Sequence, residues 1–288
     1  MSNVAILHDK QEIGAYLWRD PALHLYAIGD LDDFFWSSTV WYGLKEGENL
    51  LAVALLYTGG DLPTLLATAR QPATALATLL SRTVHLLPQR FYAHLSPEAR
   101  DALAAACLLE PRGLHFKMAL RDPGRLNDID ISGVERLTPA ATDELLAFYA
   151  HSYPGNWFDL RMLETGQYVG IRGENGDLLS VAGVHVYSAE QRVAALGNIT
   201  TAPAARGRGL ATVATAALCR SLLQTVDLIG LNVRADNVAA IACYRRLGFA
   251  FVAEYEEYMV HLKPFSVQIP NANEQNPVRR TDCGADED

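Results

Sequence analysis

The stretch at residues 206–211, which reads Arg-Gly-Arg-Gly-Leu-Ala, constrains the fold of this chain more than any other. It lies between an apolar run that ends at Thr201 and a long helical pattern that starts at Leu210. Two glycines let the main chain approach a ligand closely, and a helix beginning here points its free N–H groups into the loop. The sequence therefore predicts a strand–loop–helix unit that binds an anion, with Arg206 and Arg208 adding positive charge. The alternative is an ordinary strand–helix turn.

A second motif follows one helix and one strand later. It consists of Asn237, Ala240, Tyr244 and the pair Gly248-Phe249. The two motifs resemble those of the GCN5-related N-acetyltransferase (GNAT) superfamily, namely Arg/Gln-x-x-Gly-x-Gly/Ala and Asn-x-x-Ala-x-x-x-Tyr-x-x-x-Gly-Phe, in the same order and at the same spacing. The resemblance covers about residues 134–262. It implies that the first motif holds the pyrophosphate of acetyl-coenzyme A (acetyl-CoA).

The fold that the resemblance implies is α/β (α+β), with two GNAT-like domains, each a mixed, mostly antiparallel sheet flanked by helices. Residues 131–265 are predicted to be the catalytic domain and residues 1–125 a degenerate copy, as in the glycine N-acyltransferase-like (FR47-like) branch. Where the glycine loop should lie, this copy has Ala-Arg-Gln-Pro-Ala at residues 69–73. Proline lacks an N–H donor, so we expect no coenzyme there. Residues 267–288 are polar and are predicted to be a disordered tail.

By resemblance, the co-substrate is acetyl-CoA and its binding residues fall on both motifs and on the strand before the loop. In the family this strand splays from its neighbour, and its exposed main chain pairs with the pantetheine arm. The implied coenzyme-binding residues are Ile199, Thr200, Thr201, Arg206, Gly207, Arg208, Gly209, Leu210, Ala211, Asn237, Ala240 and Tyr244.

Tyr244 is the implied catalytic residue, because the family's tyrosine at this position gives a proton to the departing thiolate. A phenol with a pKa near ~10 is protonated at neutral pH and is suited to this role. The alternative is a core aromatic that anchors the helix. The general base stays unassigned. Some family members have a glutamate where this chain has Asn232, which cannot accept a proton, and His185 and Glu164 are the other candidates near the expected cleft.

Two aromatic segments are candidates for the acceptor site. Residues 153–158 (Tyr-Pro-Gly-Asn-Trp-Phe) fall where the fold covers the acceptor, although they also suit a packed loop. Residues 26–36 carry Asp30, Asp32 and Asp33, which would attract a cationic acceptor or simply form a solvated turn that caps a helix.

The net charge, apolar runs and cysteines exclude several classes of protein. The formal net charge of −9 over 288 residues argues against nucleic-acid binding and permits an amine-bearing substrate. The chain has no apolar run of membrane-spanning length and no signal-peptide pattern at its start, so we predict a cytoplasmic protein without membrane partners. Its four cysteines are scattered, which predicts neither a metal site nor a disulfide framework.

The predicted function is an acyl-CoA-dependent N-acyltransferase. It would transfer acetyl from acetyl-CoA to a primary amine of a small molecule or peptide, directly and in a ternary complex, as a monomer or homodimer. Two alternatives stay open. One is a non-catalytic acyl-CoA-binding or sensing module. The other is transfer of aminoacyl groups from charged tRNA, which requires a basic surface that the acidic balance disfavours.

Overall fold

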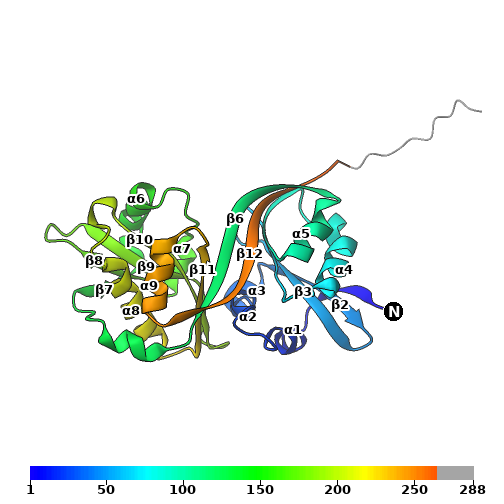
Figure 1. The fold of residues 1–288 in the computed structure, drawn as a ribbon, viewed down its shortest axis with the longest axis horizontal. Coiled ribbons are helices and arrows are strands. Elements are labelled where there is room, and N and C mark those ends of the chain that lie inside the picture. The colour runs from blue at the N-terminus through cyan, green and yellow to red at the C-terminus, as the bar shows by residue number, and fades with distance from the viewer. Residues whose placement is uncertain (265–288) are drawn as a thin grey trace, which may run out of the picture.

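The computed structural model describes residues 1–264. Its two halves lie side by side and share two long strands, β6 (Cys107–Leu120) and β12 (Phe249–Leu262), which cross the centre of the molecule (Figure 1). We call the part up to the end of β6 the N-terminal half and the part after it the C-terminal half. The predicted disordered tail and Cys283 lie outside the described residues.

Strands and helices alternate in the N-terminal half in the same order as in the C-terminal half. The N-terminal half contains β1 (Asn3–Leu7), α1 (Lys10–Leu17), α2 (Leu25–Gly29), α3 (Asp33–Trp36), β2 (Thr39–Glu46), β3 (Asn49–Tyr57), β4 (Thr64–Ala67), α4 (Thr74–Thr83), η1 (Val84–Leu86), β5 (Arg90–Leu95), α5 (Pro97–Ala104) and β6.

The C-terminal half contains η2 (Pro123–Asp128), β7 (Val134–Arg136), η3 (Pro139–Ala141), α6 (Thr142–Ser152), α7 (Leu160–Glu164), β8 (Val169–Arg172), β9 (Leu178–Ser188), β10 (Val193–Thr201), η4 (Pro203–Ala205), α8 (Leu210–Leu222), β11 (Leu228–Arg234), α9 (Val238–Arg246) and β12. The predicted α/β class and the mostly antiparallel pairing are confirmed. No helix in the described part of the chain is long and apolar enough to cross a membrane. The cytoplasmic location stays a prediction.

All twelve strands form one sheet, in the order β1-β2-β3-β4-β5-β12-β6-β11-β10-β9-β8-β7. Residues 256–261 of β12 pair with β5, so the last strand of the C-terminal half completes the sheet of the N-terminal half. Residues 115–119 of β6 pair with β11 in return. The halves therefore exchange strands, and the domain boundary near residues 125–131 stays a prediction because neither side of it holds a complete sheet.

The exchange explains one difference from the sequence-based expectation. Read from the local sequence alone, residues 97–107 favour a helix and a strand would begin only at His115. In the structure α5 ends at Ala104 and β6 begins at Cys107. The strand continues through Pro111 because β12 pairs with it along its whole length. Pairing with a partner far away in sequence thus overrides local turn residues.

Apolar side chains pack into three clusters. One fills the N-terminal half beneath α4 and α5, and a second fills the C-terminal half around α8. The third joins the halves, because residues of α1, α2 and β3 pack there against Val186, Val193 and Ala195 of β9 and β10. We call this third region the seam. It places α2 of the N-terminal half directly on the sheet of the C-terminal half.

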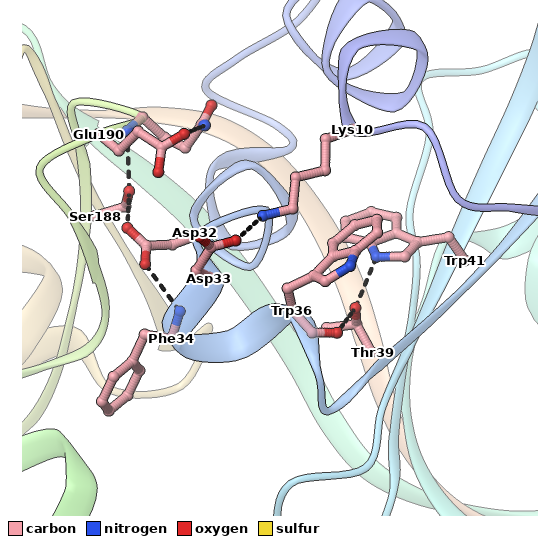
Figure 2. A network of polar contacts seen from close by, with 10 residues as sticks. Lys10, Asp32, Asp33, Phe34, Trp36, Thr39, Trp41, Ser188 and Glu190 are labelled. Atoms are coloured by element: carbon pink, nitrogen blue, oxygen red, sulfur yellow. Dashed lines mark hydrogen bonds and ion pairs between the residues drawn. The ribbon is translucent and has the colours of Figure 1, made fainter.

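Polar contacts fix the seam at the turn between α2 and α3. The Ser188 hydroxyl donates to Asp32 at 2.6 Å, and Asp32 also accepts from the Phe34 main-chain N–H at 3.0 Å. Lys10 bonds Asp33 and lies 4.9 Å from the Trp36 ring centre (Figure 2). Asp32 is thus the N-cap of α3, as the capping interpretation of this acidic run predicts.

Candidate active site

The glycine loop leads from β10 into α8 and faces open space. Gly207 and Gly209 both have a φ of 78°, a left-handed conformation that costs other L-residues ~1 kcal/mol. A Cβ added to either glycine would meet no atom within 4 Å. Gly209 is the N-cap of α8 and supplies no side-chain cap. The N–H groups of the first turn, starting with Leu210 and Ala211, therefore point at a space where an anion fits.

The two loop arginines differ in their surroundings. Arg206 donates to the carbonyl oxygens of Ser152 at 3.1 Å and Thr201 at 3.2 Å, which ties the loop to the end of α6. Arg208 is exposed, and its guanidinium contacts no partner within residues 1–264. Sequence alone treated both as coenzyme ligands. The structure places only Arg208 as a free charge beside the loop.

This difference predicts separable effects. Arg208→Ala should weaken acetyl-CoA binding about fivefold, because a surface charge near a phosphate contributes ~1 kcal/mol, and should leave the melting temperature unchanged. Arg206→Ala should lower the melting temperature, because two carbonyls lose their donor at ~1 kcal/mol each. Thermal unfolding and calorimetric titration of both variants test this. Equal loss of affinity without destabilisation in both would contradict the assignment.

Strand β10 separates from β11 beside the loop. The parallel pairing runs only from Val193 to Leu196, opposite Leu228 to Leu231. Both strands continue beyond it, to Thr201 and Arg234. We call the gap between residues 197–201 and 232–234 the open split. On its β11 side, the main chain of Ile199, Thr200 and Thr201 therefore has no strand partner. The family resemblance predicts such a splay, and pairing of these residues with the pantetheine arm stays a prediction.

The corresponding place in the N-terminal half is closed. Strands β4 and β5 pair along the full length of β4, and the Ser96 N–H then bonds the Ala67 carbonyl at 3.1 Å. At the start of α4, Glu98 accepts from the Ala73 N–H at 3.4 Å. The protein's own carboxylate thus occupies the helix N-terminus where an anion would bind. This supports the prediction that this half binds no coenzyme.

The second motif lies against the first. Asn237 caps α9, with its side-chain oxygen accepting from the Ala240 N–H at 3.1 Å. The Cys243 sulfur lies 3.2 Å from the Thr212 hydroxyl in the first turn of α8. Ala240 is half-buried and Tyr244 is buried, with its ring centre 5.9 Å from that of Phe249. The two motifs that are far apart in sequence therefore meet at one side of the open split.

The environment of Tyr244 keeps its hydroxyl protonated. Burial raises the pKa of Tyr244, and neighbouring Cys243 and Tyr153 add to the rise. Tyr26 of α2 also lies near it and belongs to the N-terminal half. Burial raises the pKa of Tyr26 in turn, and the Asn232 main-chain N–H at its hydroxyl offsets part of that rise. Two neutral phenols from opposite halves thus lie near the open split.

Strand β10 contains a distortion that the sequence did not predict and that hydrogen bonds hold in place. Asn198 has a φ of 55° and is 4% exposed. The Tyr149 hydroxyl donates to its carbonyl at 2.9 Å, and the Asn198 amide donates to the Tyr168 hydroxyl at 3.0 Å. The pairing with β9 shifts register across this residue, between Gly197 and Thr200. Asparagine tolerates positive φ, but no spacing in the sequence marked this position.

Of the two candidates for a general base, His185 and Glu164, neither is singled out. The side-chain oxygen of Asn232 and Nε2 of His185 are both buried without a partner among the described residues. Burial lowers the pKa of His185, which keeps the imidazole neutral at neutral pH. Glu164 occupies an exposed position at the end of α7. The base stays unassigned.

The aromatic segment after α6 reaches the seam. The ring centre of Trp157 lies 5.7 Å from that of His185 and 6.2 Å from that of Tyr57 in the N-terminal half. The Asn156 amide donates to the Asn198 side chain at 3.2 Å. This segment therefore covers the distorted part of β10. Its role in binding the acceptor stays a prediction.

Comparison with known proteins agrees with this geometry. Residues 134–249 match the model of the acetyltransferase (GNAT) family. Mycothiol acetyltransferase of Mycolicibacterium paratuberculosis is 29% identical over 203 residues, which is 59% of this chain and 64% of that protein. The chain thus spans slightly less than two thirds of the length of the curated relatives that it matches.

Solved structures share the fold across both halves. A Drosophila protein superposes with a TM-score of 0.67 at 16% identity, covering 91% of this chain and 98% of that one. A tandem GNAT protein from the clavulanic acid biosynthesis pathway has a TM-score of 0.56 at 16% identity, covering 92% and 99%. At 16% identity these structures show the shared fold alone. The family match is confined to residues 134–249, and the solved structures show that the chain as a whole has the tandem GNAT fold.

Proposed function

We propose that this protein is an acetyl-CoA-dependent N-acetyltransferase that acetylates a primary amine of a small molecule or peptide. One observation carries the proposal: the glycine loop, the open split and Tyr244 lie together in the C-terminal half, while the N-terminal half has its split closed and its helix N-terminus occupied by Glu98. A site built for an anion joined to an extended arm suits coenzyme A.

We assign the following roles. The first turn of α8, Gly207 and Gly209 bind the pyrophosphate, with Arg208 adding charge. The main chain of residues 199–201 holds the pantetheine arm, and Asn237 and Ala240 line its other side. A bound acetyl thioester supplies the activated acyl group. Metal ligands are not part of this proposal.

The proposed transfer is direct. The amine nitrogen attacks the thioester carbonyl carbon, the C–N bond forms and the C–S bond breaks. The Tyr244 hydroxyl gives its proton to the leaving sulfur, and the proton released by the nitrogen restores the phenol through water. This chemistry requires a phenol that is neutral at rest, and the raised pKa of Tyr244 supports that state.

The test is calorimetric titration with acetyl-CoA, followed by thiol release against a panel of amines. The name of the curated relatives makes acceptors related to mycothiol a sensible part of the panel. We expect one site per chain and turnover with at least one amine. Binding without turnover on any acceptor would favour the sensing module. If acetyl-CoA does not bind, the glycine loop is not a coenzyme site.

A further inference from the structure

The seam holds a buried acid without a partner. Asp30, at the C-cap of α2, is 5% exposed. Its main-chain N–H bonds the Tyr26 carbonyl at 3.0 Å, but its carboxylate makes no hydrogen bond or ion pair with the described residues 1–264. Its neighbours in sequence differ, since Asp32 caps α3 and Asp33 bonds Lys10. A buried polar group normally has a partner. An acid that lacks one here needs an explanation.

Aromatic rings from both halves lie around this position. Tyr26 and Tyr57 come from the N-terminal half. Tyr26 lies one helical turn before Asp30 in α2, and Tyr57 belongs to the same apolar cluster of the seam as residues of α2. His185 and Trp157 come from the C-terminal half. Their ring centres form a chain, with Tyr57 to Trp157 at 6.2 Å, Trp157 to His185 at 5.7 Å and His185 to Tyr26 at 6.4 Å. All three pairs meet edge to face.

This aromatic group borders the place where the acyl group would be transferred. The His185 ring lies against Gly197, where an added Cβ would come within 2.1 Å of the ring. Gly197 is the first residue of β10 beyond the pairing with β11. At the other end, the main chain of Asn232, on the opposite edge of the open split, lowers the pKa of Tyr26, and Tyr26 in turn adds to the rise in the pKa of Tyr244. The group therefore spans the entrance to the split.

A buried carboxylate beside a group of aromatic rings matches one class of ligand. An ammonium ion gains from the negative ring faces and from the carboxylate, and both interactions strengthen away from water. An anionic or purely apolar ligand would leave the acid unpaired, which is costly. Trp157 is 48% exposed, so this wall faces the solvent from which a ligand enters. Burial raises the pKa of Asp30 to about 8, as expected for an acid that lacks its cation.

We propose that Asp30 and the aromatic group of Tyr26, Tyr57, Trp157 and His185 form the acceptor subsite, which recognises the primary ammonium of an alkyl- or arylalkylamine. The inference rests on the proposed function and deepens it. It also gives the N-terminal half a role, because that half supplies the acid and two of the four rings. On this proposal, the N-terminal half does not bind the coenzyme, and instead it forms one wall of the acceptor subsite.

The experiment compares binding of phenethylamine with that of 2-phenylethanol, its uncharged analogue, by calorimetry on the full chain saturated with coenzyme A. We expect the wild type to bind the ammonium at least ~10-fold more tightly than the alcohol. Asp30→Asn should lose this preference. Asp33→Asn, a matched change of an exposed acid three residues away, should keep it. Trp157→Ala, at a half-exposed position, should weaken amine binding even if Asp30→Asn folds poorly.

The outcomes separate this inference from the proposed function. An Asp30→Asn variant that keeps the wild-type preference, or a wild type without any preference, would overturn the acceptor subsite while acetyl-CoA binding and turnover stand. Failure of the wild type to bind acetyl-CoA would overturn the proposed function. In that case the same titrations of amine and alcohol, repeated without coenzyme, still decide whether Asp30 selects an ammonium.

Discussion

Gly209→Val is expected to raise the Kd for acetyl-CoA by at least ~100-fold while the protein stays folded. The added side chain enters space that is empty of protein atoms and that the pyrophosphate would fill. It would keep the phosphates from the N–H groups of Leu210 and Ala211. Hydrogen bonds to charged groups contribute ~1.5–3 kcal/mol each, so losing two of them costs ~3 kcal/mol or more, which corresponds to about 100-fold.

Backbone strain must be separated from steric exclusion, and the chain offers a matched control. Gly133 has the same φ of 78° and the same absence of atoms within 4 Å of an added Cβ, but it lies before β7, outside the proposed site. Gly133→Val should therefore suffer a comparable loss of melting temperature and keep its affinity for acetyl-CoA. Calorimetric titration measures both variants. Unchanged affinity in Gly209→Val would show that the loop does not bind the coenzyme.

The parts of this site that the sequence predicts are local in the chain. The glycine loop and the positions of Asn237 and Tyr244 each depend on residues within one turn or one helix. Main-chain geometry follows directly from such residues, because only glycine takes a φ of 78° without strain. The lack of a glycine loop in the N-terminal half could be predicted in the same way, since the residues from Ala69 to Ala73 contain no glycine.

The parts that sequence did not predict depend on contacts between distant segments. Strand exchange places Glu257 of β12 opposite His94 of β5. No pattern within either strand identifies a pairing partner so distant in the sequence. Tyr26 and Asp30 lie at the seam because α2 packs on β9 and β10. Read locally, Asp30 belongs to an acidic run with Asp32 and Asp33. Only the packing reveals that one of the three acids is buried and unpaired.

Arg206 illustrates the limit of a motif. Its position in the Arg-Gly-Arg-Gly stretch predicts a coenzyme ligand as strongly as that of Arg208. In the structure its guanidinium donates to the carbonyls of Ser152 and Thr201 instead. Whether a motif arginine faces the ligand or the protein depends on where the end of α6 lies, and the sequence of the loop holds no information about that.

Tyr244→Phe is expected to lower kcat by ~100-fold or more and leave the Kd for acetyl-CoA unchanged. General acid catalysis contributes about 10²–10⁴-fold, and the substitution removes only the proton that the thiolate would take. The ring keeps its packing against Phe249, so the fold should survive. Turnover is measured at saturating acetyl-CoA by thiol release, and affinity by titration.

The control must remove a buried phenol hydroxyl elsewhere. Tyr42 is 4% exposed and packs in the core of the N-terminal half, so Tyr42→Phe reports the general effect of such a loss and should keep full turnover. The second tyrosine at the split makes the result more informative. If Tyr244→Phe keeps its rate and Tyr26→Phe loses it, the proton donor comes from the N-terminal half. If both variants keep their rates, the thiolate is protonated from water and Tyr244 serves packing alone.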